Sequence, residues 1–96
     1  MSETFTGPAT IVLGEHEFRV TVRLSARFEP VEGRHRWAGR AVPDDDLTAA
    51  FRSGVRDVTV RTADGGVARP ARLGEPDPWG GVRITGVGAP PWDLGF

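Results

Sequence analysis

The chain has 96 residues, which is enough for one domain, because a polypeptide this short has apolar side chains for only a single core. Hydrophobic residues make up 39% of it and charged residues 26%, a balance typical of soluble globular domains rather than of disordered segments. The net charge of -1 argues against a nucleic-acid partner, and the absence of cysteine excludes disulfides and thiolate chemistry.

The basic residues are all arginine: the chain has 12 and no lysine. A genome rich in G and C explains this bias through codon usage. A set made only of arginine also suits bidentate capture of carboxylate or phosphate groups better than lysine does. Both interpretations remain open at the level of the sequence.

The first β-rich segment covers residues 9–13 and follows a tail, residues 1–6, that we expect to be irregular. Gly14 and Glu15 then predict a hairpin turn. Residues 17–28 alternate strictly between apolar and polar side chains. Because successive side chains of a strand point to opposite faces, only an extended segment places all the apolar ones on one surface. The sequence therefore predicts a long, half-buried strand here.

A third strand is expected over residues 34–42, after the turn at residues 29–33. Its alternation places His35 and Trp37 on one face, which we expect to point inward. The opposite face carries three arginines and is expected to be solvated: Arg34, Arg36 and Arg40.

Residues 43–46 break the β pattern, and Leu47, Ala50 and Phe51 follow at helical spacing. We expect one short helix whose N-terminal N–H groups are capped by the preceding aspartates. Three more strands are expected at residues 55–62, 67–73 and 82–87, with an irregular tail from residue 88 to residue 96. Pro70 predicts an edge or a bulge in the fifth strand.

Six antiparallel strands in one flat sheet would leave an apolar face and two long edges in water. The sequence therefore predicts a mainly β domain, a six-stranded antiparallel small barrel with one short helix over an opening. A strongly bent sheet or a sandwich is the alternative. Trp92 and Phe96 are expected to fold back over the core. The predicted core consists of Phe18, Val20, Val22, Leu24, Phe28, Trp37, Phe51, Val58, Val60, Leu73, Val82 and Ile84.

Two segments carry candidate functional residues. His35, on the third strand, suits a general acid or base at a barrel mouth, although a structural histidine near a turn is the simpler interpretation. The loop Asp77-Pro78-Trp79-Gly80 is stiffened by prolines on both sides of Asp77. Trp79 is either a contact for a ligand or partner, or a plug for one barrel end. The candidate ligand-binding residues are His35, Trp37, Arg40, Asp77 and Trp79.

The sequence shows no spacing of histidines and acids that indicates a metal site, and no signature of a catalytic triad or a phosphate-binding loop. We therefore expect no metal, no cofactor and no assigned catalytic residue. No stretch approaches the ~20 apolar residues of a membrane span. The expected location is the cytoplasm, without membrane attachment.

Two longer patterns resemble a bacterial family of small domains of unknown function. They are F-x-P-x-x-G-R-x-x-W-x-G-R, over residues 28–40, and D-P-W-G, over residues 77–80. Domains of this kind occur alone or at the C-terminus of flavin-dependent monooxygenases. The resemblance implies an association with oxidative small-molecule metabolism and assigns no activity to any residue.

These observations favour a non-catalytic module that binds a small molecule or docks on an oxidoreductase. The alternative is a small catalytic barrel of the isomerase or cyclase type, in which His35 acts as acid or base with Arg40 or Asp77. It requires an internal pocket of roughly 300 Å³ or more. A third possibility is a self-associating domain, for example a homodimer, in which edge strands pair.

Overall fold

The structure is a computed structural model that describes residues 3–63 and 67–92. These residues form six strands and one helix, in the order β1 (Glu3–Leu13), β2 (His16–Glu29), β3 (Arg34–Ala41), α1 (Asp45–Arg52), β4 (Asp57–Thr62), β5 (Arg69–Pro76) and β6 (Val82–Val87). The prediction of a mainly β fold with a single short helix is confirmed.

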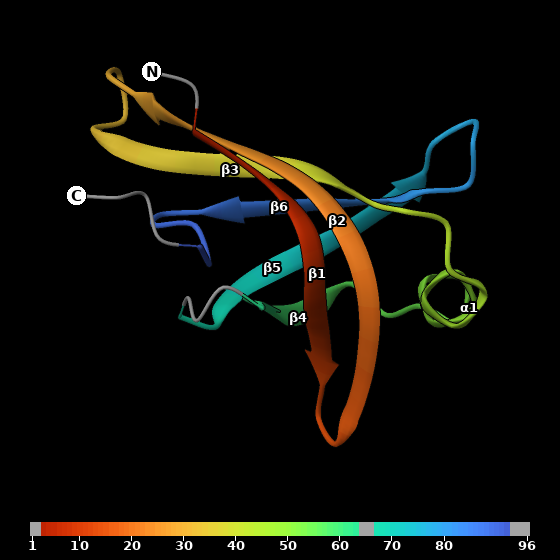
Figure 1. The fold of residues 1–96 in the computed structure, drawn as a ribbon. Helices are drawn as coiled ribbons and strands as arrows, with labels where there is room; N and C mark the ends of the chain where they lie inside the picture. The colour runs from red at the N-terminus through yellow and green to blue at the C-terminus, as the bar shows by residue number, and fades with distance from the viewer. Residues whose placement is uncertain (1–2, 64–66, 93–96) are drawn as a thin grey trace.

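The strands close into a barrel in the order β1-β2-β3-β6-β5-β4, and every neighbouring pair is antiparallel. The closed order decides between the barrel and the sandwich. Figure 1 shows how the long β1–β2 hairpin curves around one side of the molecule, while β3, β6 and β5 follow one another across it. Closure removes the unpaired sheet edges that a single open sheet would expose.

Strand β1 begins at Glu3, so the expectation of an irregular tail over residues 1–6 is wrong from residue 3 onward. Gly7 and Pro8 make this segment a poor strand by composition. Its extended conformation is imposed by β2, whose 14 residues offer partners as far as the pair Glu3↔Ala26. Residues 1–2 and 93–96, the latter including Phe96, lie outside the described residues.

Strand β5 lies a little further along the chain than predicted, and Pro70 is near its start. This strand pairs with β4 over Arg69–Arg72, but it pairs with β6 only from Arg72 onward. Pro70 therefore occupies a position where no β6 partner needs the N–H that proline lacks. The register irregularity in this strand falls later, between Gly74 and Pro76.

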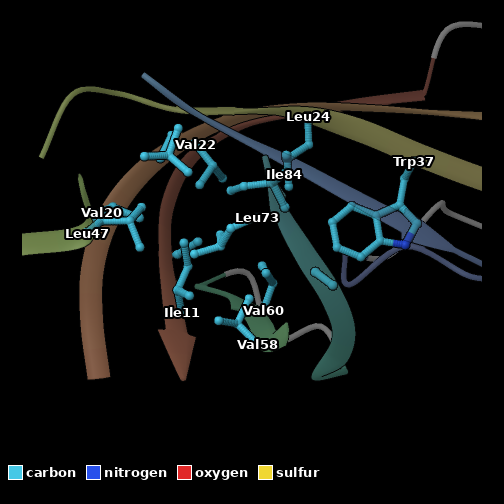
Figure 2. Packing of buried hydrophobic residues seen from close by; sticks show 14 of the residues in the cluster. Ile11, Val20, Val22, Leu24, Trp37, Leu47, Val58, Val60, Leu73 and Ile84 are labelled. Carbon is cyan, nitrogen blue, oxygen red and sulfur yellow. The ribbon is translucent and has the colours of Figure 1, made fainter. Parts of the chain in front are cut away.

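Apolar side chains from all six strands and from α1 form one core cluster inside the barrel. Figure 2 shows many of them, including the labelled Ile11, Val22, Ile84 and Trp37, packed toward one another from different strands. Most of the predicted core is buried, and Phe18 is half-buried against it. Among the buried apolar residues of the strands and of α1, the prediction missed Ala9, Ile11, Ala26, Ala41, Leu47 and Ala71. Trp92 folds back over the core as expected and is 6% exposed.

Phe28 was predicted to be a core residue, and this is wrong because its side chain is 53% exposed. It pairs with His35 near the tip of the β2–β3 hairpin. Strand β6 pairs with β3 only between Arg36 and Arg40, so the hairpin tip extends beyond the closed part of the barrel. The alternation of β2 does place Phe28 on the inward face, but at this position no other strand covers that face.

Helix α1 is capped by Asp44, whose Oδ1 accepts a hydrogen bond of 2.9 Å from the backbone N–H of Leu47. This confirms that the acidic run serves the helix start. Leu47 and Phe51 are buried and hold α1 against β5 and β6. In the part of the chain that the structure describes, no helix has the length and apolar character needed to cross a membrane.

Candidate functional site

The loop between β5 and β6 folds toward β3 and brings together three of the predicted site residues. Asp77 directly follows β5, Trp79 and Gly81 are in the loop, and Arg40 is on the outer face of β3. We call the group of Arg40, Asp77, Trp79 and Gly81 the Asp77 corner. Its centre is a salt bridge of 2.9 Å between Arg40 Nη1 and Asp77 Oδ2.

The carboxylate of Asp77 organises the loop around itself. Its Oδ1 accepts hydrogen bonds from the backbone N–H groups of Trp79, at 2.9 Å, and of Gly81, at 3.0 Å. The backbone adds two more bonds, from Asp77 N–H to Gly81 O at 2.8 Å and from Gly80 N–H to Asp77 O at 2.9 Å. The loop is therefore held at both ends by one residue, the side chain of which is only 13% exposed.

These contacts lower the pKa of Asp77 below its ordinary value of 3.8. The largest cause is the hydrogen bond from the Gly81 N–H, which outweighs the opposing effect of desolvation. The Trp79 N–H and the Arg40 guanidinium lower the pKa further. Asp77 is consequently a fixed negative charge at neutral pH, and it is suited to holding Arg40 rather than to exchanging protons.

Trp79 lies on the surface and is 76% exposed, so its interpretation as a plug for the barrel end is wrong. The guanidinium carbon of Arg40 is 5.9 Å from the centroid of the indole ring. Between them is a hollow of about 180 Å³, lined by Arg23, Arg40, Ala41, Val42, Pro43, Asp77, Trp79 and Gly81. The indole is thus presented outward beside a paired arginine.

Trp37 and His35 do not join this corner. The side chain of Trp37 is 1% exposed and packs edge-to-face against Trp92, with ring centroids 6.4 Å apart. Its position in the core leaves it out of reach of a ligand in solvent. His35 lies near the hairpin tip, where its ring packs edge-to-face against Phe28, with the two ring centroids 5.4 Å apart.

The catalytic pairing of His35 with Arg40 or Asp77 is not assembled in this structure. His35 and Arg40 are five residues apart on β3, which is about 17 Å along a strand. Asp77 is bonded to Arg40 at the far end of that distance. Among the described residues, no group of histidines and acids could hold a metal ion.

Two further arginines lie beside Arg40, and the sequence analysis did not single them out. In the barrel register Arg23 of β2 and Arg83 of β6 are the direct partners of Arg40 on its two sides. The three side chains point outward, because their strand neighbours are buried. Strand parity predicts this orientation, but only the strand order β2-β3-β6 and its register show that the three are adjacent.

Comparison with known proteins gives a family and no activity. A family model described as a domain of unknown function (DUF4873) matches residues 2–94. Uncharacterized proteins of Mycobacterium bovis and of two strains of Mycobacterium tuberculosis are 38% identical to the chain over 93 residues. The match covers 94% of the chain but only 25% of each relative, so the chain spans about a quarter of their length. No solved structure gives a significant match.

Proposed function

The chain belongs to the DUF4873 family of domains of unknown function, and from that premise we propose that it is a non-catalytic interaction module that docks on an oxidoreductase through the Asp77 corner. The observation that carries the proposal is the exposed indole of Trp79, held in place by a loop that Asp77 closes. Aromatic and arginine side chains dominate the energetics of protein interfaces, and Trp79 and Arg40 provide both.

Two features favour docking over catalysis. The core cluster occupies the barrel interior with side chains from every strand, which supports an outer rather than an inner site. The hollow beside Trp79, at about 180 Å³, is smaller than the roughly 300–1,000 Å³ typical of pockets that enclose a small ligand. An exposed indole beside a small hollow fits a protein surface better than it fits an enclosed metabolite.

The rigidity of the corner also favours binding. Asp77 fixes the loop before any partner arrives, so little conformational entropy is lost when Trp79 is covered. Arg40 already has its carboxylate, which lowers the penalty for covering its charge. Pre-organisation of this kind increases affinity without additional contact area.

The choice of an oxidoreductase as partner depends on two sequence observations. The patterns over residues 28–40 and 77–80 resemble domains found alone or at the C-terminus of flavin-dependent monooxygenases. The mycobacterial relatives extend far beyond the region that matches this chain. We propose that this chain contacts a monooxygenase of the same cell in the way that a fused domain would contact its neighbour.

The test is a binding titration of the purified chain against flavin-dependent monooxygenases from its source organism, by biolayer interferometry. We expect Trp79→Ala to weaken binding by about tenfold or more, as for a central aromatic of an interface. Its thermal midpoint should match that of the unsubstituted chain, because the side chain is exposed.

Phe28→Ala is the matched control, since Phe28 is also an exposed aromatic but lies at the β2–β3 hairpin tip, away from the Asp77 corner. This variant should bind as the unsubstituted chain does. Equal binding by folded Trp79→Ala, or no binding by any of the monooxygenases, would contradict the proposal.

A further inference from the structure

We propose that Arg23, Arg40 and Arg83 form a binding site for a small multivalent oxyanion, a polycarboxylate or a phosphate ester. We call these three residues the arginine row. The inference goes beyond the proposed function and does not depend on it, because it concerns the outer face of β2, β3 and β6 rather than Trp79. The hollows of the two sites share Arg23, Arg40 and Asp77 in their linings, whereas Trp79 lines only the docking site and Arg83 only the arginine row.

The three arginines are aligned across the sheet. Arg40 is directly opposite Arg23 on one side and Arg83 on the other, so one arginine from each of three adjacent strands falls on a single line across the sheet. Neighbouring strands are about 4.8 Å apart, which puts the Cα atoms of the outer two about 10 Å apart. Arginine side chains are long enough to converge over that span on one ligand.

The arginine row concentrates positive charge on neighbouring strands. Like charges directly opposite each other on adjacent strands are destabilising, and the arginine row contains two such contacts in succession. Nearer the tip of the β2–β3 hairpin, two arginines of this face have acids close by, at 3.0 Å for Arg27 with Glu29 and at 2.6 Å for Arg36 with Glu32. In the arginine row only Arg40 is paired, through Asp77.

Arg23 and Arg83 have no carboxylate or other hydrogen-bond partner for their guanidinium groups anywhere in residues 3–63 or 67–92. Arg40 gives only Nη1 to Asp77, and a guanidinium has five N–H donors. The arginine row therefore offers two free forks and part of a third. Guanidinium forks match the oxygens of carboxylates and phosphates in bidentate geometry.

There is also space for a ligand beside the arginine row. A hollow of about 400 Å³ is lined by the arginine row together with Ala38, Gly39 and Asp77. Ala38 and Gly39 provide no long side chain to fill it. A larger residue cannot replace Gly39 without a backbone shift, because an added Cβ would overlap the carbonyl of Arg23. The hollow is wide open to solvent, so a charged ligand can reach the three guanidinium groups from outside the barrel.

Asp77 determines which anions are favoured. Its fixed negative charge, bonded to Arg40, repels an anion at the centre of the arginine row. A single small anion therefore gains little. A ligand with two or more anionic groups can bind Arg23 and Arg83 at once, and this is the reason for assigning a multivalent class.

The test follows the arginine Nε–Hε signals by NMR while citrate or pyrophosphate is added at constant ionic strength. We expect saturable shifts at Arg23, Arg40 and Arg83 with at least one of these probes. Saturation with citrate alone identifies a carboxylate ligand class, and saturation with pyrophosphate alone identifies a phosphate class. No saturation with either probe would overturn the proposal.

The double variant R23Q/R83Q should bind the saturating probe at least about tenfold more weakly, because charged hydrogen bonds are lost on both sides. Arg19→Gln is the matched control: Arg19 is exposed on the same strand β2, but it faces Thr10 instead of another arginine. It should leave the affinity unchanged. Thermal melts verify folding, and the single variant Arg83→Gln replaces the double variant if that one unfolds.

Three other results would overturn the proposal. One is an equal loss of affinity with Arg19→Gln and with R23Q/R83Q, which would mean that the probe responds to the loss of any positive charge and not to the arginine row. Another is full affinity in the folded double variant. The third is tighter binding of a single-stranded oligonucleotide than of either probe, which would indicate a nucleic-acid surface. Trp79→Ala separates this site from the proposed docking function, because it should keep the anion affinity.

Discussion

At the scale of single residues, Asp77 shows how one side chain turns a loop into a surface. The sequence predicts a stiff loop from the two prolines that flank it, and the structure adds the mechanism, in which one carboxylate accepts two backbone N–H groups and one guanidinium. Gly81 is needed for the same closure. A Cβ at that position would lie 2.6 Å from the carbonyl oxygen of Ala41. The orientations of Trp79 and Arg40 both depend on this arrangement.

We predict a pH-dependent effect of Asp77→Asn. The folded chain lowers the pKa of Asp77, so the unfolded chain binds a proton more readily, and the stability due to the ionised form is lost as pH falls through the depressed value. At neutral pH the variant should melt at a lower temperature than the unsubstituted chain. The difference should begin to shrink near pH 3.8, where the carboxylate of the unfolded chain becomes protonated, and should shrink further as the pH falls through the lower pKa of the folded chain.

Thermal melts followed by circular dichroism across a pH series measure this difference. Glu15→Gln is the control, since Glu15 is exposed in the β1–β2 turn and forms no salt bridge within the described residues. It should show no such difference at any pH. If the difference in melting temperature between Asp77→Asn and the unsubstituted chain stays constant from neutral to acid pH, the charge of the carboxylate does not stabilise the loop.

The candidate site could be predicted from the sequence only in part. Asp77 and Trp79 are recognisable because they lie close together in a loop in which prolines flank Asp77 on both sides. Arg23 and Arg83 are 60 residues apart along the chain, and each has the same outward parity as several other arginines. Their adjacency to Arg40 follows from strand register, which alternation in one strand does not specify.

At the scale of elements, the β3–β6 pair joins the core to the outer face. Trp37 on β3 is the direct partner of Gly86 on β6, and its indole lies against that glycine. The Gly86 backbone is in an ordinary extended region, so glycine is required there by space rather than by conformation. The pair therefore depends on the match between the largest side chain and the smallest residue.

We predict that Gly86→Ala destabilises the domain by about 1–3 kcal/mol, the usual cost of forcing a methyl group into a packed core. The added Cβ would overlap atoms of the Trp37 indole, which is buried in the core at 1% exposure. Urea denaturation measures the free energy of unfolding, and near-ultraviolet circular dichroism monitors the displaced indole. Gly74→Ala on β5 is the control.

An added Cβ at Gly74 meets only Arg83, with its nearest atom at 3.3 Å, so the loss should be smaller than at Gly86. Equal stability of Gly86→Ala and the unsubstituted chain would show that the indole can move without cost. Sequence patterns give no warning of this pair. Gly86 reads as an ordinary strand glycine until the register places Trp37 beside it.

At the scale of the whole molecule, barrel closure was predictable from one physical requirement. A strand with six apolar residues on one face needs a second layer, and a chain of 96 residues can supply it only by rolling its own sheet. Alternation in β2 also identified Val20, Val22 and Leu24 as core residues. The strand order was not predictable, because β6 inserts between β3 and β5 through pairings that are distant in sequence.

Closure of the barrel limits how two copies of the chain can associate. Each of the six strands that the structure describes has a strand neighbour on both sides over part of its length, so none of them is free along a whole edge. The longest stretches with a neighbour on one side alone are residues 3–7 of β1 and 16–20 of β2. We therefore expect sedimentation velocity to show one species with the mass of a monomer at every concentration examined. Trp79 is the exposed side chain that could mediate a different mode of association. If a dimer forms and Trp79→Ala dissolves it, the Asp77 corner is a contact between copies. If the dimer survives that change, the contact lies elsewhere, and the segments to test next are residues 3–7 of β1 and 16–20 of β2, which have a strand neighbour on one side alone.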